Sequence, residues 1–230
     1  MKTHSLDRLF KPQTVAVVGA SERETSLGRA LMENLVKGGF EGEIYPINPN
    51  YPTILGLPAF PDVTAVKVPV DLAVIATPIG GIPEVMQQCG QARVGAAIII
   101  ATGGKETGPE GEKIEAAIKA AADEAGIRFL GPGSWGLLCP SERLIATFAP
   151  HGAKAGNLAF ISESAALCSS ILGWATRKNI GFSHFISVGS KTDLDFADLI
   201  DYLGYQETAK SIIIYMENLT LPRKIGRAHV

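Results

Sequence analysis

Short runs of β-branched and aliphatic residues alternate with helix-forming stretches along this chain, and this alternation limits its possible folds more than any other feature. Before residue 131, the expected strands and helices lie at residues 14–18, 27–37, 43–47, 72–76, 82–92, 96–101, 112–125 and 127–130. Such alternation is typical of parallel βαβ units. The strands are apolar throughout, as expected when helices cover both faces of a sheet. The sequence therefore predicts an α/β fold with a doubly wound parallel sheet.

The pattern breaks at Gly131-Pro132-Gly133-Ser134 and stays irregular as far as residue 156. Glycine, proline and the loss of periodicity predict a connection between two domains, with the boundary near residues 149–155. The rhythm of strands and helices then resumes at residues 158–161, 165–178, 182–188, 196–203 and 211–215. We therefore expect a first domain over residues 1–150 and the start of a second, flavodoxin-like α/β domain over residues 155–223.

The last seven residues, 224–230, show no continuity with the preceding pattern and match the translation of a common sequencing-adapter sequence. We therefore predict that they are a non-native tail and that the natural protein continues beyond Arg223. The flavodoxin-like domain would then be truncated in this chain. A stop codon directly after Val230 in the gene would contradict this expectation.

The composition excludes several classes of protein. Of the 230 residues, 46% are hydrophobic and 19% are charged, which suits two folded cores rather than a disordered chain. The formal net charge is −2 and the basic residues are scattered, so no nucleic-acid partner is expected. Apolar runs such as 96–101 are too short to cross a bilayer, and the polar start is not a signal peptide. We expect a cytoplasmic protein with no membrane partner.

The three cysteines, Cys89, Cys139 and Cys168, are widely separated in the sequence. They lack the close pairs that are typical of zinc sites and redox motifs. We interpret them as buried, unreactive residues and expect no metal site.

The first strand-to-helix turn of this Rossmann-type domain, Gly19-Ala20-Ser21, is a candidate phosphate site. Ser26 is a plausible N-cap of the helix that follows, and Gly28 allows a close approach of that helix to the turn or to a ligand. Backbone N–H groups at the positive end of a helix bind phosphate. Because the full dinucleotide motif G-x-G-x-x-G is missing, a purely structural glycine turn stays an alternative at this point.

The end of the second strand argues against NAD. Enzymes that bind NAD place an acidic residue there on the ribose hydroxyls, whereas this chain has Asn48-Pro49. An asparagine amide can bind an adenine or a phosphate instead. Later strands end in Thr77-Pro78 and Thr102-Gly103, which we expect at the same carboxyl edge of the sheet.

Together these segments resemble the CoA-binding domain of the NDP-forming acyl-CoA synthetases, which include ADP-forming acetate-CoA ligases and the succinyl-CoA synthetase α subunit. The resemblance covers residues 6 to about 221. In that family the Gly-Ala-Ser turn and the Asn-Pro pair hold coenzyme A. The resemblance therefore implies a CoA site that contains Gly19, Ala20, Ser21, Gly28, Asn48, Pro49, Thr77, Pro78, Thr102, Gly103 and Ser134.

The second domain resembles the ligase part of the same family. Ser162-Glu163-Ser164 is similar to the family's Ser-Gln-Ser-Gly segment, whose helix start receives the phosphate of a phosphohistidine. The resemblance implies that Ser162 and Ser164 hold phosphate and that Glu217 orients the catalytic histidine. Without this resemblance, Ser162 and Ser164 are equally well interpreted as helix caps, and Glu217 as a solvent-exposed acid. A glutamate in place of the usual glutamine puts a negative charge beside the phosphate, which opposes binding unless it is neutralised.

Other departures limit what this chain can do alone. The family histidine lies in a Ser-His-Thr-Gly loop that these residues lack, and neither His151 nor His184 has that setting. We therefore expect this chain alone to be inactive. Ser134 stands in place of a cysteine and Ala165 in place of a glycine, as in the branch fused to GNAT-type protein lysine acetyltransferases.

Three functions follow from these residues. The leading hypothesis is an acid–thiol ligase that uses CoA, a small carboxylic acid, and ATP/ADP or GTP/GDP. The nucleotide would be bound by an ATP-grasp domain or a β subunit outside this chain. The alternatives are a non-catalytic, CoA-sensing module of a GNAT-type acetyltransferase and an NAD-binding redox regulator.

Overall fold

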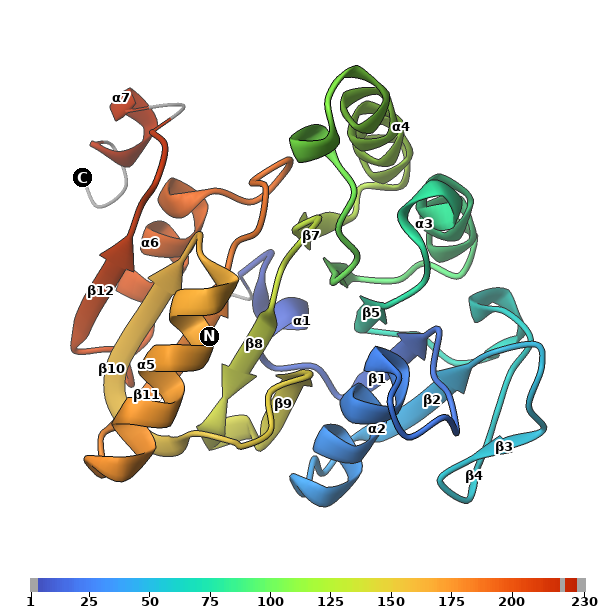
Figure 1. Cartoon of the computed structure of the whole chain (residues 1–230), viewed down its shortest axis with the longest axis horizontal. Helices are drawn as coiled ribbons and strands as arrows, with labels where there is room; N and C mark the ends of the chain where they lie inside the picture. The colour runs from blue at the N-terminus through green and yellow to red at the C-terminus, as the bar shows by residue number, and fades with distance from the viewer. Residues whose placement is uncertain (1–3, 220–221, 227–230) are drawn as a thin grey trace.

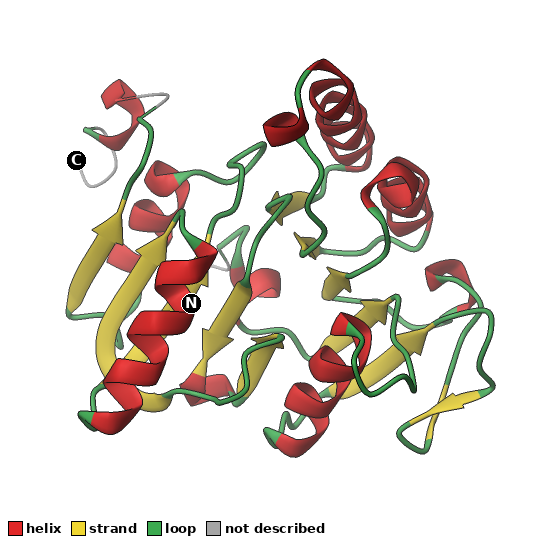
Figure 2. Ribbon diagram, in the orientation of Figure 1, coloured by secondary structure: helices red, strands yellow, loops and turns green. Residues whose placement is uncertain are grey.

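The computed structural model describes residues 4–219 and 222–226 and contains two five-stranded sheets side by side (Figure 1). Figure 2 shows helices on the faces of both sheets. A small hairpin, β3 (Thr53–Ile54) and β4 (Leu57–Pro58), extends from the first sheet. The short 3-10 turns are η1 (Val63–Ala65), η2 (Ile79–Gly81), η3 (Lys105–Thr107) and η4 (Pro140–Glu142).

The first sheet is parallel throughout and has the order β2-β1-β5-β6-β7. Its strands are β1 (Thr14–Val18), β2 (Glu43–Ile47), β5 (Leu72–Ile75), β6 (Ala96–Ile99) and β7 (Arg128–Leu130). Helix α2 (Leu27–Lys37) covers one face, and α3 (Ile82–Gln91) and α4 (Pro109–Ala125) cover the other. The predicted doubly wound sheet is confirmed.

Strand β1 shows why its sequence is apolar without interruption. Val15 and Val17 pack toward α2, whereas Ala16 and Val18 pack toward α3. Successive strand residues point to opposite faces, so a strand with helices on both sides buries every side chain. The order of this sheet also reverses next to β1, which makes its carboxyl edge the expected place for a ligand.

The second sheet has the order β12-β10-β11-β8-β9. Strands β10 (Lys154–Ser162), β11 (Gly181–Ser187) and β12 (Ser211–Tyr215) are parallel, with α5 (Ala165–Arg177) and α6 (Phe196–Gly204) on opposite faces. Strand β8 (Gly136–Cys139) pairs antiparallel with β11, and β9 (Leu144–Thr147) pairs antiparallel with β8. This mixed α/β arrangement agrees with the predicted flavodoxin-like domain.

The expected irregular stretch from 131 to 156 is wrong for two segments, because β8 and β9 are strands of the second sheet. Each contains only four residues, and β8 is fully buried, so neither has the alternation that marks a half-buried strand. The second sheet therefore begins before the expected domain boundary at 149–155.

The non-native tail at residues 224–230 stays a prediction, although the structure describes residues 222–226. Helix α7 (Pro222–Ile225) continues past Arg223, and Ile225 packs against the core beside α6. Residues 227–230 of the predicted non-native tail lie outside the described part of the chain.

The two sheets share one hydrophobic core. Helix α1 (Asp7–Phe10) lies between them and buries Leu9 and Phe10 completely. The Phe10 ring stacks on Tyr202 of α6 at 4.5 Å and meets the edge of His184 of β11 at 5.4 Å. Because burial of apolar surface drives folding, this core fixes the two halves against each other.

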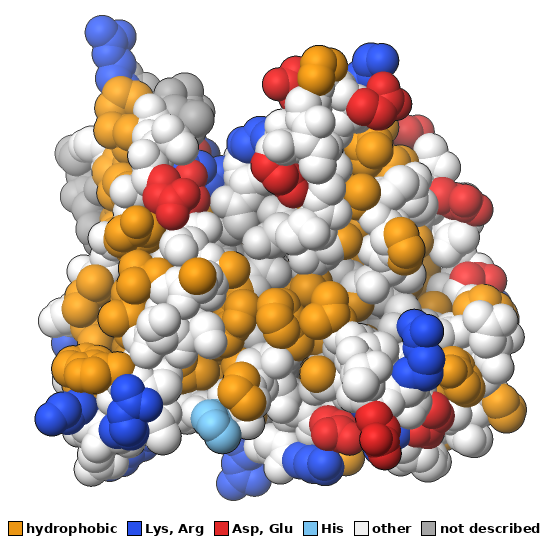
Figure 3. Space-filling view, viewed as in Figure 1, with side chains coloured by type: hydrophobic (Ala, Val, Ile, Leu, Met, Phe, Trp, Pro, Cys, Tyr) orange, Lys and Arg blue, Asp and Glu red, His pale blue; other side chains and the backbone are white. Residues whose placement is uncertain are grey.

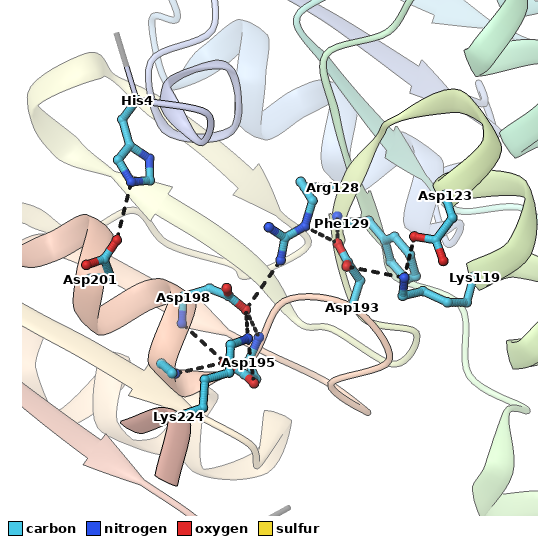
Figure 4. A network of polar contacts seen from close by, with 11 residues as sticks. His4, Lys119, Asp123, Arg128, Phe129, Asp193, Asp195, Asp198, Asp201 and Lys224 are labelled. Carbon is cyan, nitrogen blue, oxygen red and sulfur yellow. Dashed lines mark hydrogen bonds and ion pairs between the residues drawn. The ribbon is translucent and has the colours of Figure 1, made fainter. Parts of the chain in front are cut away.

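A cluster of charged side chains at the surface adds further contacts between the two halves of the chain (Figure 4). Arg128 of β7 donates to Asp193 at 2.9 Å, and its other end lies 3.3 Å from Asp198 of α6. Burial lowers the pKa of Arg128, but the two carboxylates outweigh burial and raise it above its usual value. Asp193 also accepts from the backbone N–H of Phe129 at 2.9 Å. The loop between β11 and α6 is thus anchored to the first sheet.

Within residues 4–219 and 222–226, no helix has both the length and the apolar character needed to cross a membrane. In the same residues, no group of three or more His, Cys, Asp or Glu side chains is arranged to hold a metal ion. Lys and Arg side chains lie mainly around the margin of the face drawn in Figure 3, while hydrophobic side chains gather across its middle.

Candidate functional site

A cavity of about 830 Å³ lies at the carboxyl edge of the first sheet, where the loops after β1, β2, β5 and β6 meet. Its lining residues are Gly19, Ser21, Arg23, Ser26, Leu27, Gly28, Asn48, Asn50, Tyr51, Ala76, Thr77, Pro78, Ile79, Ile100, Ala101, Thr102 and Phe148. The loops converge as the sequence predicts. The volume is that of a site for a small molecule or cofactor.

The turn after β1 brings the start of α2 against the end of β1. Gly19 has a φ of +89°, which side-chain-bearing residues rarely adopt. A Cβ atom on Gly28 would lie 1.9 Å from the carbonyl oxygen of Gly19, so no side chain fits there. The close approach expected at Gly28 is therefore present, and it carries the first turn of α2 to the cavity wall.

The N-terminus of α2 supplies hydrogen-bond donors to this wall. Ser26 caps the helix, as predicted, by accepting from the N–H of Arg29 at 3.1 Å. The N–H groups of the first helical turn, including those of Leu27 and Gly28, have no acceptor within the helix. With the helix dipole, they make this end of the cavity favourable for an anion.

Arg23 is a lining residue that sequence reasoning missed. It is exposed, and no ion pair of Arg23 is found among the residues that the structure describes. Neighbouring Arg29, in contrast, pairs with Glu22 and Glu33. The only signal for Arg23 in the sequence is its position within the loop between β1 and α2. Its guanidinium adds a positive charge to the cavity wall near the start of α2.

The Asn48 side chain makes two hydrogen bonds within the protein. Its amide nitrogen donates to the carbonyl oxygen of Ala20 at 2.6 Å, and its amide oxygen accepts from the N–H of Asn50 at 2.9 Å. Asn48 lines the cavity, but its side chain braces the turn after β1 from the neighbouring strand. Ala20 is fully buried beneath that turn.

Thr77 lines the cavity and carries an unpaired hydroxyl. Its hydroxyl oxygen is buried without a hydrogen-bond partner in the described part of the chain. An unpaired buried hydroxyl costs about 1–3 kcal/mol. A ligand that hydrogen-bonds to Thr77 would remove this cost, so the chemistry of the wall fits a polar ligand.

Four residues of the predicted CoA site are not among the lining residues: Ala20, Pro49, Gly103 and Ser134. Ser134 is buried, donates to the carbonyl oxygen of Ser187 at 2.7 Å and accepts from the N–H of Gly136 at 3.0 Å. Its hydroxyl therefore joins the end of the first sheet to β11. The other predicted residues, Gly19, Ser21, Gly28, Asn48, Thr77, Pro78 and Thr102, meet in one cavity.

The second predicted site lies at the start of α5. The Ser164 side chain caps this helix by accepting from the N–H of Leu167 at 3.3 Å. The Ser162 hydroxyl accepts from the N–H of Ser164 at 3.0 Å and donates to its carbonyl oxygen at 3.1 Å. Both serines thus shape the turn between β10 and α5, whose helix end is positive.

Glu163, the departure from the family pattern in this turn, is neutralised by Lys191. The two side chains form an ion pair and are 10% and 3% exposed. The other carboxylate oxygen accepts from the N–H groups of Glu217 and Asn218 at 2.9 and 3.2 Å. Burial raises the pKa of Glu163, but Lys191 and the two N–H groups outweigh burial and hold it below its usual value.

The hydrogen bonds to the Glu163 carboxylate also fix the position of the Glu217 backbone. Its backbone is tied to Glu163, and its side chain is exposed at the end of β12, on the same edge as the start of α5. Ser162, Ser164 and Glu217 are therefore brought together as the sequence predicts. His184 lies elsewhere, buried in β11, where burial and then the charge of Lys11 lower its pKa to about 4.

Two family models match this chain. A CoA binding domain matches residues 13–140, and a succinyl-CoA ligase like flavodoxin domain matches residues 155–229. The chain belongs to the CoA-binding domain family. The cavity over the first sheet lies in this CoA-binding domain, and the start of α5 lies in the flavodoxin-like one. The predicted resemblance is confirmed in both halves.

Several similar proteins are named as ligases. The α subunit of acetate–CoA ligase [ADP-forming] I of Pyrococcus furiosus is 39% identical over 219 residues, covering 94% of this chain and 47% of that protein. Acetate–CoA ligase [ADP-forming] I of Archaeoglobus fulgidus is 37% identical over 222 residues, covering 96% and 32%. The chain thus spans about a third to a half of these relatives.

A solved structure shares the fold. The dinucleotide forming acetyl-coenzyme A synthetase 1 of Ca. Korarchaeum cryptofilum, in complex with phosphate and ADP, superimposes with a TM-score of 0.92 at 41% identity. The match covers 97% of this chain and 47% of the synthetase. The arrangement of the two sheets is therefore that of an acyl-CoA synthetase.

Proposed function

We propose that this chain is the CoA-binding portion of an ADP-forming acid–thiol ligase. The observation that carries the proposal is the cavity over the first sheet. It combines the Gly19 turn, the start of α2, Arg23 and the unpaired Thr77 hydroxyl, and it belongs to a CoA-binding domain whose relatives are acetate–CoA ligases. The phosphates of CoA would lie at the start of α2.

The second domain would hold the phosphate that the reaction transfers. Ser162 and Ser164 shape the positive helix end, Lys191 cancels the charge of Glu163, and Glu217 is exposed beside them. A phosphohistidine from outside the described residues would approach there, and Glu217 would fix its tautomer. A small carboxylic acid would take the phosphoryl group, and the CoA thiol would then displace phosphate to form the thioester.

The nucleotide, ATP/ADP or GTP/GDP, would be bound by an ATP-grasp domain or β subunit outside this chain. The Pyrococcus furiosus relative is itself named as an α subunit, which supports a partner subunit. The ligase relatives favour this function over the acetyltransferase module that Ser134 and Ala165 suggest. Position 48 holds an asparagine rather than the acidic residue that binds the ribose of NAD, which disfavours NAD as the ligand.

Calorimetric titration of this chain with CoA and, separately, with NAD tests the proposal. We expect saturable 1:1 binding of CoA and no measurable heat with NAD. Added salt should weaken CoA binding, because the phosphates are held partly by charge. Binding of NAD without binding of CoA would contradict the proposal and favour the redox regulator.

A further inference from the structure

One wall of the CoA cavity comes from the second sheet. Among the described residues that line the cavity, Phe148 alone lies beyond Thr102 in the sequence. It follows β9 directly, at the edge of the second sheet that faces α2 (Figure 1). The second sheet thus contributes an aromatic ring to a cavity that is otherwise built by the first.

The backbone on both sides of Phe148 is fixed by one side chain of α2. The amide nitrogen of Asn34 donates to the carbonyl oxygens of Thr147 at 2.6 Å and Ala149 at 2.7 Å. Both amide hydrogens are therefore used to hold the residues that flank Phe148. The same helix carries the phosphate-binding end of the cavity, so Asn34 sets the position of Phe148 relative to that end.

The ring itself is held from the other side by the second sheet. The Trp135 ring lies 6.1 Å away in an edge-to-face arrangement. The Thr147 hydroxyl donates to the carbonyl oxygen of Trp135 at 2.5 Å, which locks the strand end beneath the ring. Phe148 is only partly buried and lines the cavity.

Phe148 and Ile100 are both apolar residues of the cavity wall, and Ile100 lies directly after β6. In this fold the ribose of a nucleotide lies beyond the end of β2. Strands β2 and β6 are three positions apart in the sheet, which corresponds to about 14 Å at the usual strand spacing. The two ends of the cavity therefore suit different parts of one long ligand.

We propose that Phe148 packs against the uncharged pantetheine arm of CoA and that Asn34 is the positioning residue that holds Phe148 in place. This inference rests on the proposed function. Phe148 and Ile100 provide apolar surface for the arm, while the start of α2 and Arg23 bind the phosphates. The arm, which ends in the thiol, is thereby directed toward the second sheet, which carries Ser162 and Ser164.

The test compares CoA with adenosine 3′,5′-bisphosphate, a ligand that has the ribose phosphates but lacks the arm. Phe148→Ala should weaken CoA binding about tenfold or more in calorimetry, since the contact with a large apolar side chain is lost. Binding of the bisphosphate should change less than twofold. Phe148→Leu, which keeps an apolar contact, should restore most of the CoA affinity. Tyr205→Ala, at a 73% exposed ring, is the control.

Asn34→Asp has nearly the same shape but cannot donate to the two carbonyl oxygens. It should weaken CoA binding in the same direction as Phe148→Ala and leave bisphosphate binding intact, which also shows that the variant is folded. Equal losses for both ligands, or unchanged CoA binding in Phe148→Ala, would overturn the role of Phe148 while leaving the proposed function in place. A wild-type chain that binds no CoA would overturn both.

Discussion

Replacing Lys191 with Met should destabilise the second sheet, because it leaves the Glu163 carboxylate buried without its cation. Both side chains are nearly inaccessible, at 10% and 3% exposure. Breaking a buried ion pair by removing one partner costs about 3–5 kcal/mol. Two backbone N–H groups continue to bind Glu163, so we expect a smaller loss of about 2–3 kcal/mol in the free energy of unfolding.

The pKa of Glu163 predicts how the stability loss in Lys191→Met depends on pH. In the wild type the pKa of Glu163 lies below its usual value, so the carboxylate contributes stability above about pH 4.3 and loses it as the pH falls through the lower, folded pKa. Without Lys191 the pKa of Glu163 should rise, because burial still opposes the charged form while the cation that opposes this effect is gone. The stability difference between the two proteins should therefore be largest near pH 7 and smaller near pH 4.5.

Urea unfolding at these two pH values, followed by circular dichroism, measures the difference. At pH 7 the loss corresponds to a decrease of roughly 5–10 °C in the melting temperature of a chain of this size. The matched control is Lys113→Met, which breaks the exposed pair with Glu110 and should cost less than about 1 kcal/mol. Equal losses for the two variants, or a loss that does not depend on pH, would refute the reasoning.

Three further predictions concern the cavity and the core. Gly28→Ala should weaken CoA binding at least tenfold in calorimetry, because its Cβ would collide with the Gly19 carbonyl, whereas Gly173→Ala in α5, where a Cβ has room, should leave affinity unchanged. Arg23→Met should weaken CoA binding several-fold and reduce its salt dependence; an unchanged salt dependence would remove Arg23 from the phosphate site. In NMR titration, His184 should gain its proton near pH 4, so that stability falls as the pH drops from about 6.5 toward 4; a midpoint near 6.5 would contradict its burial.

Much of the fold could be predicted because long βαβ segments carry strong local signals. The bounds of β1, α2 and β2 agree with the sequence pattern to the residue. Strands β8 and β9 cannot be predicted, because four residues between turns are too few to show a periodicity that separates a strand from a loop. Local reasoning sees an element only when its pattern extends over enough residues.

The site could be predicted in part. Glycine turns and helix starts are local, so the turn at Gly19, the cap at Ser26 and the close approach at Gly28 could be predicted from the sequence. Contacts between distant segments could not be predicted. Asn48 braces the turn after β1, and Lys191 neutralises Glu163 across 28 residues of sequence. Phe148 could not be predicted for the same reason, because its place in the cavity depends on how the two sheets pack.

A crystal structure of this chain with CoA bound tests the central claim most directly. The account predicts the phosphates of CoA at the Gly19 turn and the start of α2, the unpaired Thr77 hydroxyl in contact with the ligand, and the thiol arm along Phe148 toward the second sheet. CoA bound outside this cavity, or bound with its phosphates at Phe148 and its thiol at the start of α2, would contradict it.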